Sequence, residues 1–397
     1  MSNGTSDTTT VAEHGPVAAL CAALEQLGLD GPLTVHHNRQ GSALDGLALV
    51  PNAQKPRMVV PAGTHRAAAS ALRRYSSAVG NKERIQRALA ATAIGLWGAR
   101  APLASHRLTL SLGTQRGIIE HLGNVLGEPV NASLTVGTER ANRKPVLQLF
   151  SAHGRPLAFA KVGTNDFTAN LVDHEAHALG RLQQHNFQRL RTPQLLHHGS
   201  WNGHSFLLME VLPATALGAS RRINELRHQA QDELQRVFHG GSQLLGESSW
   251  LAVQYKQLGQ VPEGHQGFER LHQGLDRLAS RYGGQSVVLG ATHGDWTAWN
   301  MAAHRGKLNV WDFERFATDV PSGFDTVHYA LNTVPAPWTS DALAAALAGT
   351  GVPHAVGAAY LADLAGRYLL GGLQRPVKGI EDKALMLVET LVKILGD

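Results

Sequence analysis

The chain has 397 residues, of which 43% are hydrophobic and 17% charged, a balance typical of globular proteins and unlike that of disordered or fibrous ones. Its formal charge is +5, but the 36 Lys and Arg residues are spread along the whole length, which favours a generic basic surface over a nucleic-acid-binding one. The single cysteine, Cys21, excludes an intramolecular disulfide and a cysteine-cluster metal site.

The first part of the chain predicts a tail and a small mixed domain. Residues 1–16 are rich in Ser, Thr and Gly, lack the blocks of a secretory signal, and predict a disordered tail. Helical spacing over 17–27 and 64–96, with short strands between them, predicts an N-terminal mixed α/β domain over 17–125. We hypothesise that this domain shapes a cleft or mediates homodimerisation. No apolar run approaches the ~20 residues of a membrane span, so we expect a cytoplasmic protein without membrane contact.

Residues 126–212 predict an antiparallel sheet with one helix. The strand-like runs SLTVG, PVLQLF and LAFAKVG are separated by polar segments, and Gly154 suits a hairpin turn between the last two. A helix is expected over 165–184. Two further strands should follow it, joined by an Asn-Gly turn.

The remainder, 213–397, predicts a mainly helical region, so the chain as a whole is expected to be α+β. Residues 287–316 are the exception, because their strand-like ends enclose a polar and aromatic loop. Helical periodicity occurs over 220–248, 265–282, 340–348 and 354–396.

That loop and the strand after it carry residues suited to phosphoryl transfer. HGDWTAWN, residues 293–300, contains Asp295 and Asn300, and VWDFE contains Asp312. Phosphoryl transfer needs a cation to bridge phosphate oxygens, an anchor for the nucleotide, and a group that orients the attacking hydroxyl. A loop followed by a returning strand can bring Asn300 and Asp312 to one Mg²⁺, which prefers oxygen ligands. The alternative is a polar turn that Asp295 caps.

Two residues upstream could supply the phosphate anchor. Lys161 shares a strand face with Phe159, which places it beside apolar side chains. Glu175 falls on the apolar helical stripe of Leu171 and Ala178. Burying an unpaired carboxylate is costly, and a lysine on the adjoining sheet would offset that cost. The alternatives are a solvated lysine at a strand edge and a partly exposed glutamate at the edge of the stripe.

Taken together, HGDWTAWN, VWDFE and LAFAKVG resemble the catalytic loop, the metal-binding motif and the third-strand lysine motif of the aminoglycoside phosphotransferase and choline kinase group. That group has a protein kinase-like fold. The resemblance covers residues 130–335 by motif, and leaves 17–125 outside it. It implies a bilobal protein, with a small antiparallel-sheet N-lobe over 126–212 and a mainly helical C-lobe over 213–397.

By this resemblance, Asp295 would accept or orient the proton of the substrate hydroxyl, and Asn300 and Asp312 would hold Mg²⁺. Lys161 would contact the α- and β-phosphates of ATP or GTP and pair with Glu175, fourteen residues further on.

The resemblance assigns five more residues. VGTERANRKP lies where a nucleotide loop is expected, but Gly137 is its single glycine and no Gly-x-Gly-x-x-Gly is present. LLMEVLP resembles the linker between lobes, whose backbone from Glu210 to Leu212 would bond the adenine ring. His293 would brace the catalytic loop, and Asp325 in GFDTVHYAL would steady it.

The sequence thus predicts a kinase that phosphorylates a hydroxyl of a small molecule, such as an aminoglycoside, a sugar or an amino alcohol. A catalytically idle kinase-like protein that binds nucleotide is the alternative. A protein kinase is disfavoured by the missing glycine loop and by HGD in place of an HRD-like sequence. Trp296 and Trp299 could line the acceptor pocket or belong to the core. The 21 histidines form no zinc motif, and no serine hydrolase elbow occurs.

Overall fold

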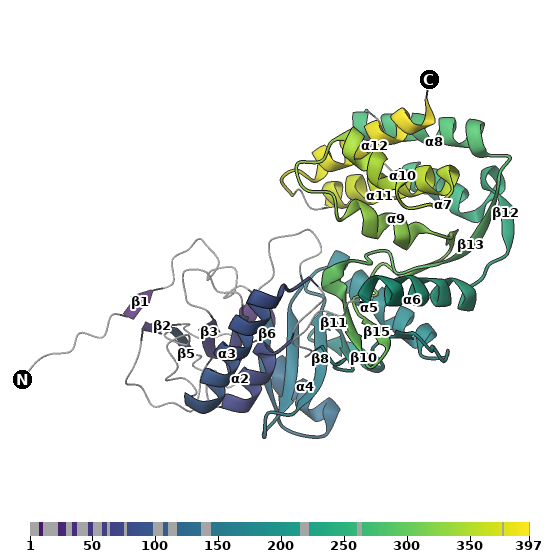
Figure 1. Cartoon of the computed structure of the whole chain (residues 1–397). Coiled ribbons are helices and arrows are strands. Elements are labelled where there is room, and N and C mark those ends of the chain that lie inside the picture. Colours follow the sequence, from purple (N-terminus) through teal and green to yellow (C-terminus); the bar gives the residue numbers. More distant parts are fainter. Residues whose placement is uncertain are drawn as a thin grey trace, which may run out of the picture. The chain divides into compact units, whose positions relative to one another are not determined.

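A computed structural model of the chain is drawn in Figure 1. It forms two compact units: unit 1 is Met1–Ala176 with Pro193–Ala219, and unit 2 is His177–Thr192 with Ser220–Asp397. The residues that the structure describes are 8–10, 23–28, 34–37, 47–50, 58–61, 64–74, 78–97, 106–109, 117–135, 144–214, 222–259, 264–374 and 377–396.

Unit 1 is built on one sheet, which has ten strands among the described residues, each antiparallel to its neighbours. The three strands expected after residue 126 are present as β6 (Val130–Thr135), β7 (Val146–Ser151) and β8 (Pro156–Val162). In spatial order the strands are β1 (Thr8–Thr10), β2 (Thr34–His37), β5 (His106–Thr109), β3 (Leu47–Val50), β4 (Met58–Pro61), β6 (Val130–Thr135), β7 (Val146–Ser151), β8 (Pro156–Val162), β11 (His204–Met209) and β10 (Leu195–Trp201).

The sheet continues across the boundary that the sequence predicted between an N-terminal domain and a lobe beginning at 126. β4 pairs with β6, with Val59 opposite Leu134. Residues on both sides of the predicted boundary therefore share one sheet within unit 1. Thr8–Thr10, inside the predicted disordered tail, forms a strand paired with β2, as suits the strand preference of threonine. Pairing between distant strands leaves no local pattern, so periodicity could not indicate it.

Helices cover both faces of this sheet. α2 and α3 share a core with Val60 and Phe150, whereas α4 packs its Ile118 and Leu122 against alternate residues of β8 on the opposite face. Lys161 lies between two of those β8 residues, so its side chain projects from the other face of the sheet, away from α4. The helices are α2 (His65–Leu72), α3 (Asn81–Trp97), α4 (Ile118–Leu126) and α5 (Asp166–Leu182), which begins in unit 1 and ends in unit 2.

Several predicted helices have different bounds in the structure. The stretch expected over 64–96 is divided into α2 and α3. Of the helix expected over 17–27, residues 23–26 are helical and 17–22 lie outside the described residues. The helix expected over 165–184 is α5, and the Asn-Gly turn is confirmed, since Asn202 and Gly203 both have positive φ angles, 47° and 80°.

Unit 2 is mainly helical, as expected for 213–397. The helix predicted over 220–248 ends at Val237, and a strand begins at Ser242 after Gly241, which has a φ of +82°. The helix predicted over 354–396 is divided into two, and Gly379 at φ +78° begins the second. The helices are α6 (Ile223–Val237), α7 (Ser249–Leu258), α8 (Gln266–Tyr282), α9 (Phe324–Leu331), α10 (Ser340–Ala348), α11 (His354–Gln374) and α12 (Ile380–Leu395), with 3₁₀ turns η3 (Leu245–Glu247) and η4 (Ala298–Asn300).

Two three-stranded sheets complete the described part of unit 2. The strands lie in the order β12 (Ser242–Leu244), β13 (Ser286–Thr292), β16 (Ala317–Pro321) in one sheet, and β14 (Met301–His304), β15 (Lys307–Val310), β9 (Leu190–Arg191) in the other.

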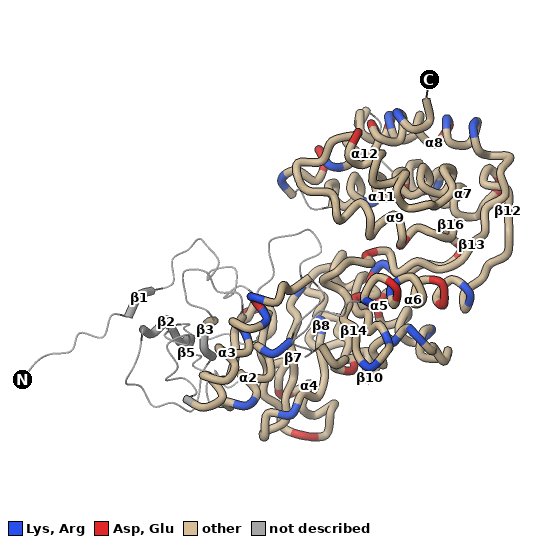
Figure 2. Tube along the Cα trace, in the orientation of Figure 1, with Lys and Arg blue, Asp and Glu red and all other residues tan. Residues whose placement is uncertain are grey.

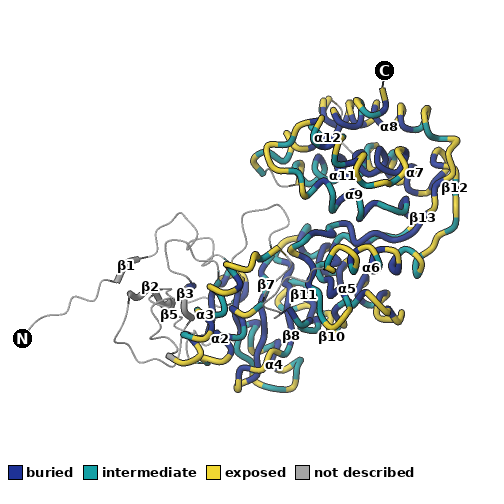
Figure 3. The backbone as a smooth tube through the Cα atoms, viewed as in Figure 1, coloured by how far each residue is buried: buried dark blue, intermediate teal, exposed yellow. Residues whose placement is uncertain are grey.

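The core of unit 2 lies between its helices. Leu271 and Leu275 of α8, Leu361 of α11 and Leu391 of α12 are each 1% exposed or less and belong to one cluster. Figure 3 shows buried stretches of these helices in dark blue. Burial of each such side chain contributes about 1.5–3 kcal/mol. Leu289 of β13 joins the same cluster, so the strand that leads into the HGDWTAWN loop is anchored in this core.

Lys and Arg residues are distributed over the elements of both units (Figure 2). Within the described ranges, no helix combines the length and the apolar character needed to cross a bilayer.

Candidate active site

Lys161 and Glu175 form a buried ion pair in unit 1. The Lys161 Nζ lies 2.7 Å and 2.6 Å from the two carboxylate oxygens of Glu175. Lys161 is 5% exposed and Glu175 is 0% exposed. The expected pairing is present, and the alternatives of a solvated lysine and an exposed glutamate are excluded. Each buried charge is compensated by the other, so removing one residue would take a compensating charge away from a buried ionic group.

The strand that carries Lys161 is held on both sides. Lys161 pairs with Val146 of β7 and with Leu207 of β11. On the same strand face, the guanidinium carbon of Arg74 lies 4.3 Å from the ring centroid of Phe159. Burial lowers the pKa of Arg74 to about 10. The sequence did not indicate this contact, since one arginine after a helical stretch carries no local signal for it.

A tight turn sets the register between Lys161 and Glu175. The Asn165 side chain accepts a hydrogen bond from the Thr168 amide (2.9 Å), and the Thr168 hydroxyl accepts one from the Asn165 amide (3.2 Å). This reciprocal pair caps the start of α5. A side chain on Gly163 would collide with the backbone of Ala169, so the chain can turn this closely only with glycine.

In unit 2, Asp325 holds the loop that follows β13. Its carboxylate accepts hydrogen bonds from the Thr292 hydroxyl (2.7 Å) and from the amides of His293 (2.8 Å) and Gly294 (3.1 Å). Asp325 is 2% exposed. Three donors converge on one buried carboxylate, an arrangement that fits the supporting position expected for Asp325.

His293 links the loop to the strand end that carries Asp312. Its Nε2 lies 3.0 Å from the carbonyl oxygen of Trp311, which can only accept, so Nε2 carries the hydrogen. Its Nδ1 then accepts a hydrogen bond from the Asp295 amide (3.1 Å). The ring is fully buried and packs 4.5 Å from the Phe313 ring. These contacts fit the bracing position expected for His293.

Gly294 allows the loop to turn. Its φ is +80°, and a Cβ there would collide with the backbone carbonyl of Arg315. The Gly294 carbonyl oxygen accepts a hydrogen bond from Arg367 Nη1 (2.8 Å). The loop backbone is therefore held at Gly294 by α11 as well as by Asp325.

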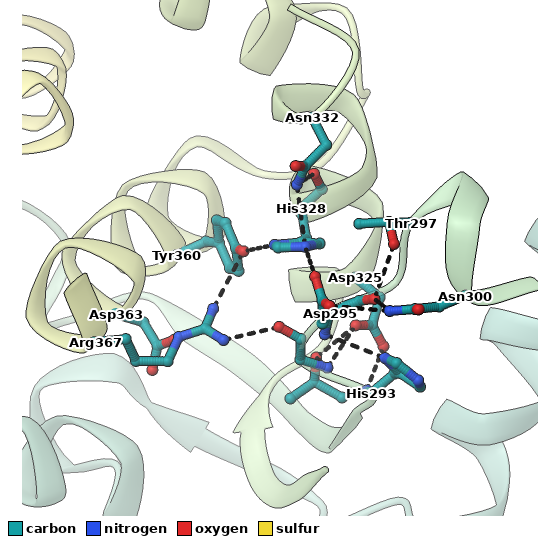
Figure 4. Close-up of polar contacts among 12 residues, drawn as sticks. His293, Asp295, Thr297, Asn300, Asp325, His328, Asn332, Tyr360, Asp363 and Arg367 are labelled. Atoms are coloured by element: carbon teal, nitrogen blue, oxygen red, sulfur yellow. Dashed lines mark hydrogen bonds and ion pairs between the residues drawn. The ribbon is translucent and has the colours of Figure 1, made fainter. Parts of the chain in front are cut away.

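The Asp295 carboxylate is held by two side chains that approach it from different directions (Figure 4). Oδ2 accepts a hydrogen bond from Asn300 Nδ2 (2.9 Å), and that nitrogen also donates to the Asp295 carbonyl oxygen (3.0 Å). Oδ1 lies 3.0 Å from His328 Nε2. The Asp295 side chain is nevertheless 32% exposed. It is thus both oriented and accessible.

Asn300 and Asp312 lie at the open end of a hairpin. β14 pairs with β15, and the Trp311 amide donates to the Asn300 carbonyl oxygen (3.1 Å), so Asp312 follows a residue that faces Asn300. Because Asn300 Nδ2 is directed to Asp295, the Asn300 Oδ1 is directed away from it. Asp312 has a φ of +75°, which is uncommon for a residue other than glycine. An amide oxygen and a carboxylate are the donors that Mg²⁺ prefers.

The other residues singled out in the sequence belong to the expected nucleotide loop, the linker and the two tryptophans of the catalytic loop. Gly137 lies outside the described residues. The Glu210 amide donates to the Gln194 carbonyl oxygen (2.9 Å), and the Leu212 side chain is 1% exposed. Trp296 is 0% exposed and belongs to the interior, whereas Trp299 is 40% exposed. The use of the Glu210–Leu212 backbone for adenine binding stays a prediction.

The sequence missed His328, the second side chain at Asp295. It lies on α9, three residues after Asp325, and residues at this spacing share a helix face. That spacing could have indicated that both side chains point towards the same loop. His328 instead counted as one of many scattered histidines.

No protein-family model matches the chain, and no curated protein sequence matches it. Among solved structures, it is similar to aminoglycoside phosphotransferase APH(4)-Ia, at 13% identity and a TM-score of 0.47, covering 69% of this chain and 98% of that one. The gentamicin complex of APH(2")-IIa has 13% identity and a TM-score of 0.42, covering 70% and 96%. Amicoumacin kinase hAmiN, in complex with AMP-PNP and Ca²⁺, has 15% identity and a TM-score of 0.38, covering 66% and 87%.

Proposed function

We propose that the protein is a magnesium-dependent small-molecule kinase, related to aminoglycoside phosphotransferases and choline kinases, that transfers the terminal phosphoryl group of ATP or GTP to a hydroxyl. The observation that carries this proposal is the Asp295 carboxylate, which Asn300 and His328 hold at 2.9 Å and 3.0 Å while 32% of the side chain stays exposed. An oriented and accessible carboxylate suits a group that receives a hydroxyl proton in phosphoryl transfer.

In this reaction Asp295 accepts the proton of the acceptor hydroxyl. Each carboxylate oxygen can accept more than one hydrogen bond, so the two side chains that hold Asp295 leave capacity for the substrate. The acceptor oxygen forms a bond to the γ-phosphorus, the bond between that phosphorus and the β–γ bridging oxygen breaks, and a nucleoside diphosphate leaves. His293 and Asp325 support the loop that positions Asp295.

Asn300 and Asp312 would hold the Mg²⁺ ion. Their donor set fits the ion, since the amide nitrogen of Asn300 is engaged by Asp295 and its oxygen is directed away. When held by Asn300 and Asp312, Mg²⁺ would offset the negative charge of the phosphoryl group being transferred.

Nucleotide anchoring is assigned to unit 1. Lys161, oriented by Glu175, would contact the α- and β-phosphates, and the backbone from Glu210 to Leu212 would bond the adenine ring. A contribution of Gly137, the cytoplasmic location and a homodimer formed through residues 17–125 stay predictions.

The test compares the protein with its Asp295→Asn variant, using ATP and GTP with a panel of aminoglycosides, sugars and amino alcohols. We expect kcat to fall by about 10²- to 10⁴-fold, with nucleotide binding retained, because the substitution removes the base and keeps the shape. Asp382→Asn, an exposed aspartate in the first turn of α12, is the matched control and should leave turnover unchanged. Undiminished turnover in Asp295→Asn would contradict the proposal. Nucleotide binding by the unaltered protein without transfer to any acceptor would favour the idle kinase-like alternative.

A further inference from the structure

The helix after the catalytic loop places a histidine directly on Asp295. His328 of α9 is 4% exposed, and its Nε2 lies 3.0 Å from Asp295 Oδ1 (Figure 4). Asp325, on the same helix, bonds the loop backbone at His293 and Gly294. His328 is thus the α9 residue that contacts the carboxylate itself.

The other side of the imidazole is bonded to a buried tyrosine. His328 Nδ1 is within hydrogen-bonding distance of the Tyr360 hydroxyl, and that hydroxyl accepts a hydrogen bond from Arg367 Nη2 (3.2 Å). Tyr360 is 1% exposed, and burial raises its pKa well above the usual value, so the hydroxyl keeps its hydrogen. A guanidinium can only donate. The Tyr360 oxygen therefore accepts from Arg367, and its own hydrogen is available to His328 Nδ1.

Arg367 is itself fixed. Its Nε lies 3.0 Å from Asp363 Oδ2, and Asp363 accepts from Trp250 (3.5 Å) and Gln254 (3.3 Å). Burial opposes the guanidinium charge, but the Asp363 carboxylate contributes to a pKa of Arg367 above its usual value. Arg367 also donates to the Gly294 carbonyl oxygen (2.8 Å). Arg367 thus holds both the loop backbone at Gly294 and the Tyr360 hydroxyl that faces His328.

The direction of these bonds determines the tautomer of His328. Because the Asp295 carboxylate can only accept, His328 Nε2 carries the hydrogen and donates it to Oδ1, and in the neutral ring Nδ1 then accepts from the Tyr360 hydroxyl. Asn332 Nδ2 also lies 3.0 Å from Nε2, but this nitrogen donates to the His328 carbonyl oxygen (2.9 Å). A bond from Asn332 to Nε2 would leave two acceptors, Nε2 and Oδ1, facing each other. A hydrogen bond to a carboxylate is the stronger of the two, so the donation to Asp295 prevails.

We propose that His328 is a positioning residue for phosphoryl transfer, whose neutral Nε2–H tautomer, set by Tyr360 and Arg367, holds Oδ1 of Asp295. With Asn300 on Oδ2, this second bond fixes the plane of the carboxylate towards the acceptor hydroxyl. The inference rests on the proposed function, since it concerns the residue that would receive the hydroxyl proton.

The kinetic test uses His328→Leu, His328→Gln and Tyr360→Phe. A misplaced reacting group costs about 10²-fold in rate, so we expect a loss of that size in kcat for His328→Leu with an unchanged KM for nucleotide. His328→Gln should recover part of it, because the glutamine amide can donate from a position close to Nε2. Tyr360→Phe should reduce kcat less than His328→Leu. The control is His272→Leu, which breaks an exposed His–Asp pair on α8 (3.1 Å to Asp276) and should leave kcat unchanged.

A second measurement does not depend on turnover. Long-range ¹H–¹⁵N NMR of histidine-labelled protein reports which ring nitrogen carries hydrogen, and the His328 signal is identified by its absence in His328→Gln. We expect the Nε2–H form in the unaltered protein and a mixture of tautomers in Tyr360→Phe. Thermal unfolding of each variant verifies that it is folded.

The outcomes separate the two proposals. An Nδ1–H tautomer, or a kcat for folded His328→Leu within twofold of the unaltered protein, would overturn the role of His328 while leaving the kinase assignment intact. If the unaltered protein transfers phosphate to no acceptor, the proposed function fails together with the catalytic meaning of His328, even where NMR finds the expected tautomer.

Discussion

At the scale of single residues, the Lys161–Glu175 pair combines a structural cost with a proposed function. Both side chains are buried, at 5% and 0% exposure, so each charge depends on the other. We expect Lys161→Met to destabilise unit 1 by about 3–5 kcal/mol, because the buried Glu175 carboxylate loses the positive charge that Lys161 places beside it. The double variant Lys161→Met/Glu175→Leu should recover most of that stability without recovering nucleotide binding. Urea unfolding and nucleotide titration distinguish the two effects, and equal stability of the single and double variants would contradict this account.

Gly294 shows how one backbone angle supports the catalytic loop. Gly294→Ala should lower stability by about 1–2 kcal/mol for the left-handed conformation, with a further cost for the collision with the Arg315 carbonyl, and should lower kcat. Gly306→Ala is the matched control, since Gly306 has a φ of +77° and nothing within 4 Å of an added Cβ. It should show the conformational cost alone and retain turnover. Equal kcat losses in both variants would indicate that the collision is unimportant.

At the scale of elements, hydrogen bonds at helix ends contribute to unit 2 independently of the site. The Ser248 hydroxyl accepts from the Leu251 amide (3.3 Å) and donates to the Leu245 carbonyl oxygen (2.7 Å), which caps α7. Ser248→Ala should lower the free energy of unfolding by about 1 kcal/mol. Ser249→Ala, at the exposed neighbouring position, should change it little. Denaturant midpoints measure both, and a larger effect at Ser249 would contradict the capping role.

Some of these elements could be predicted from local sequence patterns alone. Strands β6, β7 and β8 and the turn at Gly203 were predicted because alternation and Asn-Gly chemistry are local properties. The helix predicted over 220–248 ends at Val237 in the structure, because apolar spacing alone does not mark the residue at which a helix stops.

At the scale of the whole molecule, the continuous sheet predicts that residues 1–125 cannot be removed without loss of unit 1. Their deletion would remove Ile118 and Leu122, which pack beside β8. It would also remove β4, which pairs with β6. We expect residues 126–397, expressed alone, to lose hydrogen-exchange protection in β6–β8 and to lose nucleotide binding. Retained protection and turnover would instead indicate the separable N-terminal domain that the sequence predicted.

The sequence by itself determined the α+β class, the order of most elements and the candidate residues of HGDWTAWN and VWDFE, because periodicity and short spacings are local properties. The strand and helix patterns placed Lys161 and Glu175 beside apolar side chains, and the family resemblance implied that the two would pair. Only the tertiary structure decided that Tyr360 and Arg367 of α11 support His328, that His328 contacts Asp295, and that β4 joins β6. These contacts join residues far apart in the chain, and they form only when packing brings separate elements together.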